Sequence, residues 1–391
     1  MDSQDSTNPY LAFYGEHHIS PVHQDLSNFR SHLERREKLY RMLGLPLPVF
    51  SSKRILEVGP GGGYNTLTLF IWGGNVDFVE PNPAAREDLK QLLAKYRIAG
   101  PRWNLYPGVI EEYAPEFFYD IVIAEGFIPG LYDRRQVIAK LKRLARPGGV
   151  VVVTCFDELS TFFEVLKRLV AHCLIRNVTD YQEKVTILCR AFESHLKTLR
   201  YVSRPIADWV QDMFLNPAFH GRIFNIADCI EEFGAEFDFL GGSPAMFTNY
   251  QWYKDSDFDN RANIINQYKM KRHTLLFWDM PESIRPAADN DLLSGLASRI
   301  RSLAGELEQD WQTGINIISQ RMIPLLKEFN SFAGDLDGRV SGTINEVIEL
   351  LTTSNLTAAK VARAGYFSKA FGRGQQYISL VKKTVYDPVE L

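Results

Sequence analysis

The chain has 391 residues, of which 45% are hydrophobic and 23% are charged, with a formal net charge of −3. The length suggests two or three domains or one elaborated domain, and the composition is that of an ordinary soluble protein. The charge balance gives no sign of binding to nucleic acid or an anionic membrane. The four cysteines lie far apart without a C-x-x-C pair, the first residues are polar, and no apolar run approaches roughly 20 residues. We therefore expect a soluble, cytoplasmic protein without zinc knuckles, disulfides or membrane spans.

Residues 1–53 form a predicted helical cover that precedes the first core strand. Residues 10–23 are rich in aromatic and histidine side chains and show no clear period. The spacing of apolar residues then predicts a helix over roughly 25–43, which ends near Gly44 and Pro46.

From Arg54 onward, the pattern alternates between short apolar runs and helical stretches. β-branched runs separated by helices indicate a parallel sheet that is covered on both faces, with ligands beyond the carboxyl ends of the strands. The strands expected from these runs span residues 55–58, 76–80, 104–106, 120–124 and 150–154.

The alternation stops after Phe156, and residues 156–222 are predicted to be a helical insertion that forms a lid. The alternation of strands and helices returns with a helix over 225–233 and strands over 237–240 and 274–278. We expect these last two strands to form an antiparallel pair at the edge of the sheet.

Residues 281–391 are predicted to form a separate helical region. Apolar residues from Leu293 to Leu325 recur every three or four positions with one stutter, and a second stripe spans 340–351. Packing of these helices on their own domain is the favoured interpretation, because Gly295, Gly305 and Gly314 weaken a long autonomous coiled coil. A homodimer contact through the same helices is the alternative.

The most informative stretch is 54–63, Arg-Ile-Leu-Glu-Val-Gly-Pro-Gly-Gly-Gly. It predicts a strand, a tight glycine turn and a helix start, where a ligand can lie against bare backbone N–H groups. A nicotinamide dinucleotide site would need G-x-G-x-x-G, but the third glycine position is Tyr64.

The run from Glu57 to Gly63 resembles the first motif of class I S-adenosylmethionine-dependent methyltransferases, an acid followed by G-x-G-x-G. Glu80, Asp120–Ala124 and Arg146–Gly149 resemble three further motifs of that family, in the same order. The resemblance implies a Rossmann-like, doubly wound α/β fold with a mostly parallel seven-stranded sheet. It covers residues 54–155 and, less closely, 225–280, and does not extend to the lid. We therefore expect a methyltransferase domain at residues 54–280 into which the lid is inserted.

The resemblance also implies S-adenosylmethionine as the cofactor. A carboxylate at Glu57 would lie near the cationic methionyl end, and Glu80 would accept both ribose hydroxyls. The turn after the third strand would flank the adenine, and the residues after the fourth strand would lie near the methyl group. The expected cofactor-binding residues are Glu57, Gly59, Pro60, Gly61, Gly63, Glu80, Pro81, Val109, Ile110, Glu125 and Gly126.

The sequence limits which acceptor is methylated. The run after the fourth strand lacks the Asn/Asp-Pro-Pro-aromatic tetrad of base amino-group methylases, and a Pro-Cys nucleophile is absent. No metal is expected, because Glu125, Asp157 and Glu158 supply too few clustered acids for a catechol-type magnesium site. A hydroxyl acceptor needs a general base, for which the candidates are His17, His18, His23, Glu125 and His220.

The predicted function is therefore O-methylation of a small molecule or a glycan intermediate in biosynthesis. The alternatives are N-methylation of an amine or peptide, and a catalytically silent methyltransferase-like subunit that binds a partner. Two stretches, 208–217 and 249–254, mix aromatic with polar residues, which suits either stacking on a sugar or planar ring or simple packing.

Overall fold

The computed structural model describes residues 9–17, 26–131, 133–200, 202, 204–217, 223–255, 260–309 and 317–384. The chain divides into two compact units, each built from segments that are distant in sequence. The sheet unit comprises Met1–Phe156, Gly221–Tyr268 and Gln375–Leu391, and the helical unit comprises Asp157–His220 and Lys269–Gly374.

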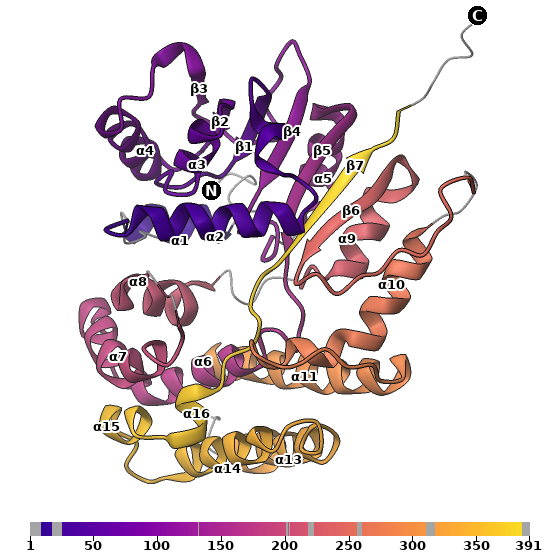
Figure 1. Ribbon diagram of the computed structural model, residues 1–391. Coiled ribbons are helices and arrows are strands. Elements are labelled where there is room, and N and C mark those ends of the chain that lie inside the picture. The colour runs from indigo at the N-terminus through magenta and orange to yellow at the C-terminus, as the bar shows by residue number, and fades with distance from the viewer. Residues whose placement is uncertain are drawn as a thin grey trace, which may run out of the picture. The chain divides into compact units, whose positions relative to one another are not determined.

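The sheet unit contains a seven-stranded sheet in the order β3-β2-β1-β4-β5-β7-β6 (Figure 1). Strands β1 to β5 pair in parallel, whereas β7 is antiparallel to both β5 and β6. The predicted Rossmann-like, mostly parallel seven-stranded fold is thus confirmed. The strands are β1 (Arg54–Val58), β2 (Asn75–Val79), β3 (Trp103–Tyr106), β4 (Tyr119–Ala124), β5 (Ala145–Cys155), β6 (Phe237–Ser243) and β7 (Gln376–Lys382).

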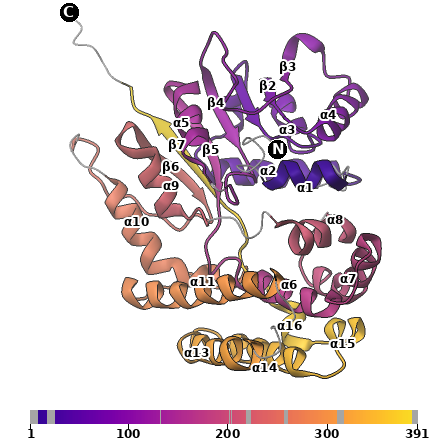
Figure 2. The ribbon, with the colours of Figure 1, turned by 180° about the vertical axis from the view of Figure 1, so that it is seen from behind.

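The seventh strand is the main correction to the predicted sheet. It is supplied by the far C-terminal segment 376–382, which the sequence places in a helical region, and it lies between β5 and β6 (Figures 1 and 2). Residues 274–278, the expected last strand, instead run from the 3-10 helix η6 (Arg272–Leu275) into a turn. Leu275, Leu276 and Phe277 are buried there, so their apolar run reflects a core position in the helical unit.

The first residues of β5 also differ from expectation. Arg146–Gly149 is expected as a turn before the strand, but it lies within β5, which begins at Ala145. The pairing between β4 and β5 shifts register between Tyr119 and Ile121, so the turn-like residues are accommodated in an irregular start of the strand.

Two N-terminal helices precede the sheet, α1 (Pro9–His17) and α2 (Phe29–Met42). Helix α1 covers part of residues 10–23, the stretch whose aromatic and histidine side chains follow no helical spacing. The second begins where the Asn28 side chain accepts a hydrogen bond from Ser31 N, which is a typical N-cap. Tyr40 of α2 packs against Phe50 and Trp72 in a core that also includes β-strand residues such as Ile55 and Val76.

The remaining helices of the sheet unit follow the predicted alternation. Asn82 caps α4 with Pro83 in its first turn, and a capping box of Asn225 and Asp228 opens α9. Helix α10 continues across the boundary into the helical unit. The bounds are η1 (Leu47–Phe50), α3 (Thr66–Ile71), α4 (Pro83–Lys95), η2 (Gly100–Arg102), α5 (Arg135–Leu144), α9 (Ile226–Phe233), η5 (Gly234–Glu236) and α10 (Asn260–Lys271).

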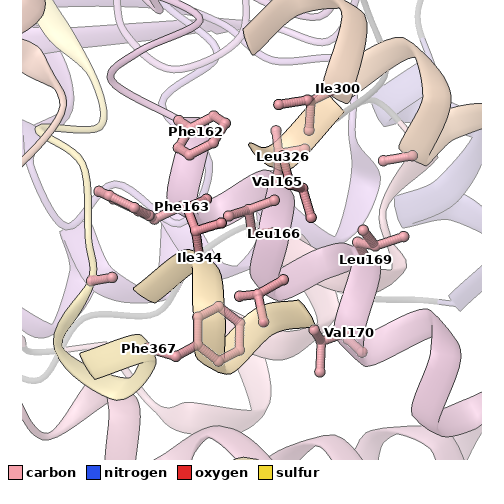
Figure 3. Packing of buried hydrophobic residues seen from close by; sticks show 14 of the residues in the cluster. Phe162, Phe163, Val165, Leu166, Leu169, Val170, Ile300, Leu326, Ile344 and Phe367 are labelled. Carbon is pink, nitrogen blue, oxygen red and sulfur yellow. The ribbon is translucent and has the colours of Figure 1, made fainter. Parts of the chain in front are cut away.

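The helical unit joins the segment predicted as a lid to the C-terminal helices in one core. The buried face of α6 contacts Ile300, Leu326, Ile344 and Phe367 from later helices (Figure 3). Its helices are α6 (Phe162–Ile175), α7 (Tyr181–Leu196), α8 (Ile206–Val210), α11 (Ala287–Gln309), α13 (Ile323–Ala333), α14 (Arg339–Thr352), α15 (Ala358–Ala362) and α16 (Gly365–Lys369), with π-helical turns η3 (Gln211–Leu215) and η7 (Ile318–Met322).

The apolar stripe that begins at Leu293, the alternative dimer contact, is buried in this core. Leu293, Leu296, Ile300, Leu303 and Leu307 of α11 are all at most 3% exposed. Over the residues that the structure describes, the stripe therefore packs inside its own chain, as the favoured interpretation expects. Among the described helices, none combines the length and apolar character that a bilayer crossing requires.

Candidate functional site

The glycine turn follows β1 and leads to α3, as the sequence predicts. Gly59, Gly61 and Gly63 all have positive φ angles, of 67°, 56° and 79°, a region that non-glycine residues rarely adopt. A Cβ at Gly63 would overlap the Leu89 Cδ1 methyl group. The turn therefore needs glycine both for its backbone shape and for its close approach to α4.

Glu80 directly follows β2 and closes the side of this turn. Its side chain is 4% exposed, and its two carboxylate oxygens accept hydrogen bonds from Gly61 N at 3.0 Å and Asn82 N at 2.8 Å. Burial raises the pKa of Glu80, against the lowering effect of these two backbone donors. A carboxylate has about four acceptor positions, so the group is held rigidly while still able to accept hydrogen bonds from a diol.

Glu57 lies inside β1, two residues before the first glycine. Its carboxylate is 6% exposed and accepts a hydrogen bond from Thr66 Oγ1 at 2.5 Å. Burial, opposed by the Thr66 hydrogen bond, raises the pKa of Glu57 to about 7. Near neutral pH the group is thus poised between its neutral and charged forms, and a nearby cation would favour the charged form.

Glu125, which follows β4, is bound by a helix that the sequence does not connect to the site. Arg36 of α2 donates from Nη1 to Glu125 Oε2 at 2.9 Å and from Nη2 to Oε1 at 2.8 Å. Tyr40 donates from its hydroxyl to the same Oε1 at 3.0 Å. All three side chains are largely buried, so this bidentate, charge-assisted contact fixes α2 against the carboxyl end of β4.

Strand β7 brings one more aromatic group to the cluster. Tyr377 is hydrogen-bonded to Arg36, and burial is the main cause that raises its pKa to about 12. Beside it, Gly126 has a φ of 91° and donates its N–H to Thr154 Oγ1 at 2.8 Å. The ends of β4, β5 and β7 thus meet around Glu125.

The other predicted cofactor residues lie at the same edge of the sheet. Pro60 sits within the glycine turn, and its carbonyl accepts a hydrogen bond from Gly63 N. Pro81 follows Glu80, and its carbonyl accepts one from Arg86 Nη1 at 2.6 Å. In the turn after β3, Ile110 is 4% exposed and Val109 is half-buried.

Of the five predicted general bases, the structure describes two, His17 and Glu125. His17 lies in the last turn of α1, with its ring 4.8 Å from that of Phe13. His18, His23 and His220 lie outside the described residues. The Glu125 carboxylate is already committed to three hydrogen bonds from Arg36 and Tyr40, so proton transfer to it would compete with these contacts.

His32 on α2 is a site residue that sequence reasoning missed. It is buried and hydrogen-bonded to the backbone of Tyr64, the residue that follows the glycine turn. Burial and the neighbouring Arg36 and Arg35 lower its pKa to about 4, so the ring stays neutral at physiological pH. Its Nε2 meets no hydrogen-bond partner within the described part of the chain.

The set of groups at this edge defines the ligand it can hold. Largely buried carboxylates lie in the last part of β1 and directly after β2 and β4, and the turn between them is lined by glycines, which have no side chains. Such a set suits a ligand with a cationic end and a ribose diol, which is the chemistry of S-adenosylmethionine. Within the described residues, no cluster of three or more His, Cys, Asp or Glu side chains is arranged to hold a metal.

Residues 56–151 match the family model described as a methyltransferase domain. These residues belong to the class I S-adenosylmethionine-dependent methyltransferase family. The cofactor of this methyltransferase domain is S-adenosylmethionine, as the sequence motifs imply. A search of curated proteins found no match.

Several solved methyltransferases are similar to part of the chain. The CcbJ methyltransferase from Streptomyces caelestis is 23% identical over 28% of this chain and 45% of its own, with a TM-score of 0.27. The glycopeptide N-methyltransferase MtfA is 22% identical over 28% and 50%, with a TM-score of 0.26. The N-methyltransferase NodS from Bradyrhizobium japonicum is 16% identical over 39% and 74%, with a TM-score of 0.30. The chain thus spans about half the length of the first two structures.

Proposed function

We propose that this protein transfers a methyl group from S-adenosylmethionine to a hydroxyl group of a small molecule or glycan intermediate. The observation that carries the proposal is the convergence of the glycine turn with Glu57, Glu80 and Glu125 at one edge of the sheet. The four free cysteines, three of them buried, support a reducing, cytoplasmic setting.

Each carboxylate has a proposed role toward the cofactor. Glu80 accepts the ribose hydroxyls, because its oxygens are already fixed by the backbone of the glycine turn. Glu57 faces the cationic methionyl end, where its charged form would be stabilised. Gly59, Gly61 and Gly63 provide bare backbone for close approach, and Val109 and Ile110 flank the adenine.

Glu125 is better suited to position the cofactor than to act as a base. Its carboxylate is held by Arg36 and Tyr40 and accepts three hydrogen bonds. The base that removes the acceptor proton is therefore assigned to a histidine of the N-terminal segment or of the 156–222 insertion. The candidates remain His17, His18, His23 and His220.

Preference for a hydroxyl acceptor rests on the residues after β4. An amine acceptor of a base methylase is usually held by a short Asn/Asp-Pro-Pro-aromatic run at this place, whereas the chain has Glu125, Gly126 and Phe127. The Glu125 carboxylate is buried against Arg36, so it is not free to receive an amine.

The same ion pair also favours a second candidate function, a catalytically silent subunit. If the Glu125 carboxylate is engaged by Arg36 and Tyr40, the protein can hold the cofactor without activating an acceptor. The two functions differ in turnover, since only the enzyme releases S-adenosylhomocysteine in the presence of an acceptor.

The test is a methyl-transfer assay with the full-length protein and methyl-labelled S-adenosylmethionine. Hydroxyl-bearing sugars, phenols and amines serve as separate acceptor panels, and NMR of the product locates the labelled carbon. We expect S-adenosylhomocysteine release that depends on a hydroxyl acceptor, with the label on oxygen. A label on nitrogen would favour the N-methyltransferase alternative, and cofactor binding without turnover on any panel would favour the silent subunit.

A further inference from the structure

One buried nitrogen atom near the glycine turn has no role in the contacts described so far. His32 of α2 is 2% exposed, and its Nε2 has no hydrogen-bond partner among the residues that the structure describes. A buried polar atom without a partner costs free energy, so most such atoms in folded proteins have one. The place of His32 in the fold indicates that the missing partner is a ligand.

His32 lies on the same face of α2 as the side chains that bind Glu125. His32, Arg36 and Tyr40 are four positions apart, which places them on one side of a helix. All three are at most 7% exposed, whereas Glu34 between them is exposed. Because Arg36 and Tyr40 both donate to Glu125, this face is turned toward the end of β4. Both views show α2 passing along the end of the sheet (Figures 1 and 2).

The imidazole ring is fixed at the end of the glycine turn. His32 is hydrogen-bonded to the backbone of Tyr64, and this bond favours the protonated ring, so the ring is the donor. Because Nε2 has no partner, the donor is Nδ1, and Nε2 of the neutral ring keeps a free lone pair. The Phe29 ring lies 6.1 Å away at 19° and supports this orientation.

The same contact brings His32 to the residues around Glu57. Tyr64 is two residues before Thr66, whose Oγ1 donates to the Glu57 carboxylate at 2.5 Å. One helical turn along α2, Arg36 holds the Glu125 carboxylate. His32 therefore lies between the segments that position two of the three acids at this edge of the sheet.

The charges at this edge identify the group that Nε2 would bind. Burial and the neighbouring arginines lower the pKa of His32 to about 4, so its free Nε2 is a hydrogen-bond acceptor at physiological pH. Glu57, Glu80 and Glu125 lie here, and Arg36 pairs with only one of them. A carboxylate or phosphate ligand would bring no donor and would be repelled by these acids. An ammonium group brings three N–H donors and a positive charge.

We propose that His32 Nε2 accepts a hydrogen bond from the α-ammonium group of S-adenosylmethionine, beside the Glu57 carboxylate. This inference rests on the proposed function, to which it adds a residue that recognises the amino-acid end of the cofactor. Helix α2 would then contact the cofactor directly, in addition to its ion pair with Glu125.

The test compares two adenosine thioethers that differ in the ammonium group alone. S-adenosylhomocysteine carries this group, whereas its deamino analogue keeps the carboxylate and has hydrogen in place of the ammonium. Calorimetry on the full-length protein measures both ligands with wild type, His32→Asn and His32→Gln. The Asn amide reaches only as far as Nδ1 and can keep the contact with Tyr64, whereas the Gln amide reaches as far as Nε2. Thermal unfolding checks that each variant is folded.

We expect His32→Asn to bind S-adenosylhomocysteine roughly tenfold more weakly or worse, which is the loss typical of one hydrogen bond to a charged group. Its affinity for the deamino analogue should equal that of wild type, and His32→Gln should recover most of the loss. His32→Ala is tested in parallel and should show the same selective loss.

His195→Asn is the matched control, since His195 is also a buried histidine with one unpartnered nitrogen in the described chain. It lies in the helical unit, where its Nε2 is 2.9 Å from the Val361 carbonyl oxygen and its Nδ1 has no partner. The ring packs edge-on against Phe192 and Phe367 in the apolar core, so His195→Asn should bind both ligands as wild type does.

Four results would overturn the proposal: no preference of wild type for S-adenosylhomocysteine over the deamino analogue, wild-type affinity in His32→Asn, an equal loss for both ligands, or no recovery in His32→Gln. In each of these cases wild type still binds S-adenosylhomocysteine, so the cofactor site stands while the role of His32 fails. If wild type binds neither ligand, the proposed function fails and this inference fails with it.

Discussion

Arg36 and Glu125 are 89 positions apart in sequence and form a two-pronged ion pair with N–O distances of 2.8 and 2.9 Å. Both side chains are largely buried, at 8% and 11% exposure. The pair links an N-terminal helix to the end of β4, at the edge of the sheet where we propose that the cofactor binds. In this proposal, α2 is part of the cofactor site.

Removing one partner of this pair is expected to be costly. Arg36→Ala leaves the Glu125 carboxylate buried without its cation, which should lower the free energy of unfolding by about 3–5 kcal/mol. Arg30→Ala is the control on the same helix, because Arg30 is 91% exposed and its ion pair with Glu34 contributes little. Chemical denaturation of both variants measures the difference.

A double substitution separates stability from cofactor binding. In Arg36→Leu/Glu125→Leu, no buried charge is left unpaired, so much of the lost stability should return. Cofactor affinity should stay low, because Glu125 and the N-terminal helix no longer shape the site. Full recovery of affinity for S-adenosylhomocysteine in this variant would assign the pair a purely structural role.

The raised pKa of Glu57 predicts a pH dependence of stability. Its pKa rises from 4.5 to about 7 in the folded protein, mainly through burial, so folding favours the protonated form. The resulting stabilisation is complete below pH 4.5 and is lost as the pH rises through about 7. By linkage this amounts to on the order of 3 kcal/mol.

Glu57→Gln removes that titration and should therefore be more stable than wild type at pH 8, but not at pH 5. Thermal unfolding of the ligand-free proteins from pH 5 to pH 8 measures the crossover. Glu87→Gln is the control, since Glu87 is exposed on α4. A constant difference between Glu57→Gln and wild type across this range would show that Glu57 does not titrate there.

Two glycines of the helical unit should respond oppositely to alanine. A Cβ at Gly372 would overlap the carbonyl oxygen of Ser160, so Gly372→Ala must displace backbone and should cost about 1–3 kcal/mol or more. Gly295 lies exposed within α11, and a methyl group added there would meet nothing within 4 Å. Gly295→Ala should stabilise by about 0.5–1 kcal/mol, and equal melting temperatures for the two variants would contradict the close packing at Gly372.

The sequence was most informative where local patterns determine structure. Five apolar runs predicted the five parallel strands, and the motifs around them predicted the acids at the ends of three, Glu57, Glu80 and Glu125. The seventh strand was missed because its partners β5 and β6 are more than a hundred residues away in sequence. The strand also contains two buried polar residues, Gln376 and Ser379, which interrupt its apolar pattern, and Ser379 Oγ donates to the Leu43 carbonyl at 2.7 Å.

The roles of Arg36 and His32 at the site could not be predicted either, because they depend on contacts between distant parts of the sequence. Arg36 is one of four arginines on α2, Phe-Arg-Ser-His-Leu-Glu-Arg-Arg-Glu-Lys-Leu-Tyr-Arg-Met, and nothing in that charged pattern distinguishes it. Only the folded chain shows that it faces Glu125, and that His32 reaches the backbone of Tyr64. The sequence instead favours the histidine-rich segment before α2 as the source of a base, because its composition is locally unusual.

The central claim is that residues 57–80 hold the nucleoside and methionyl parts of the cofactor, and calorimetry with S-adenosylhomocysteine tests it most directly. Glu80 fixes Gly61 N and Asn82 N, so Glu80→Ala removes both the diol acceptor and the support of the turn. We predict one binding site per wild-type chain and at least a hundredfold weaker binding in Glu80→Ala, with Glu87→Gln unchanged. No binding to wild type, or equal binding to Glu80→Ala, would contradict the account.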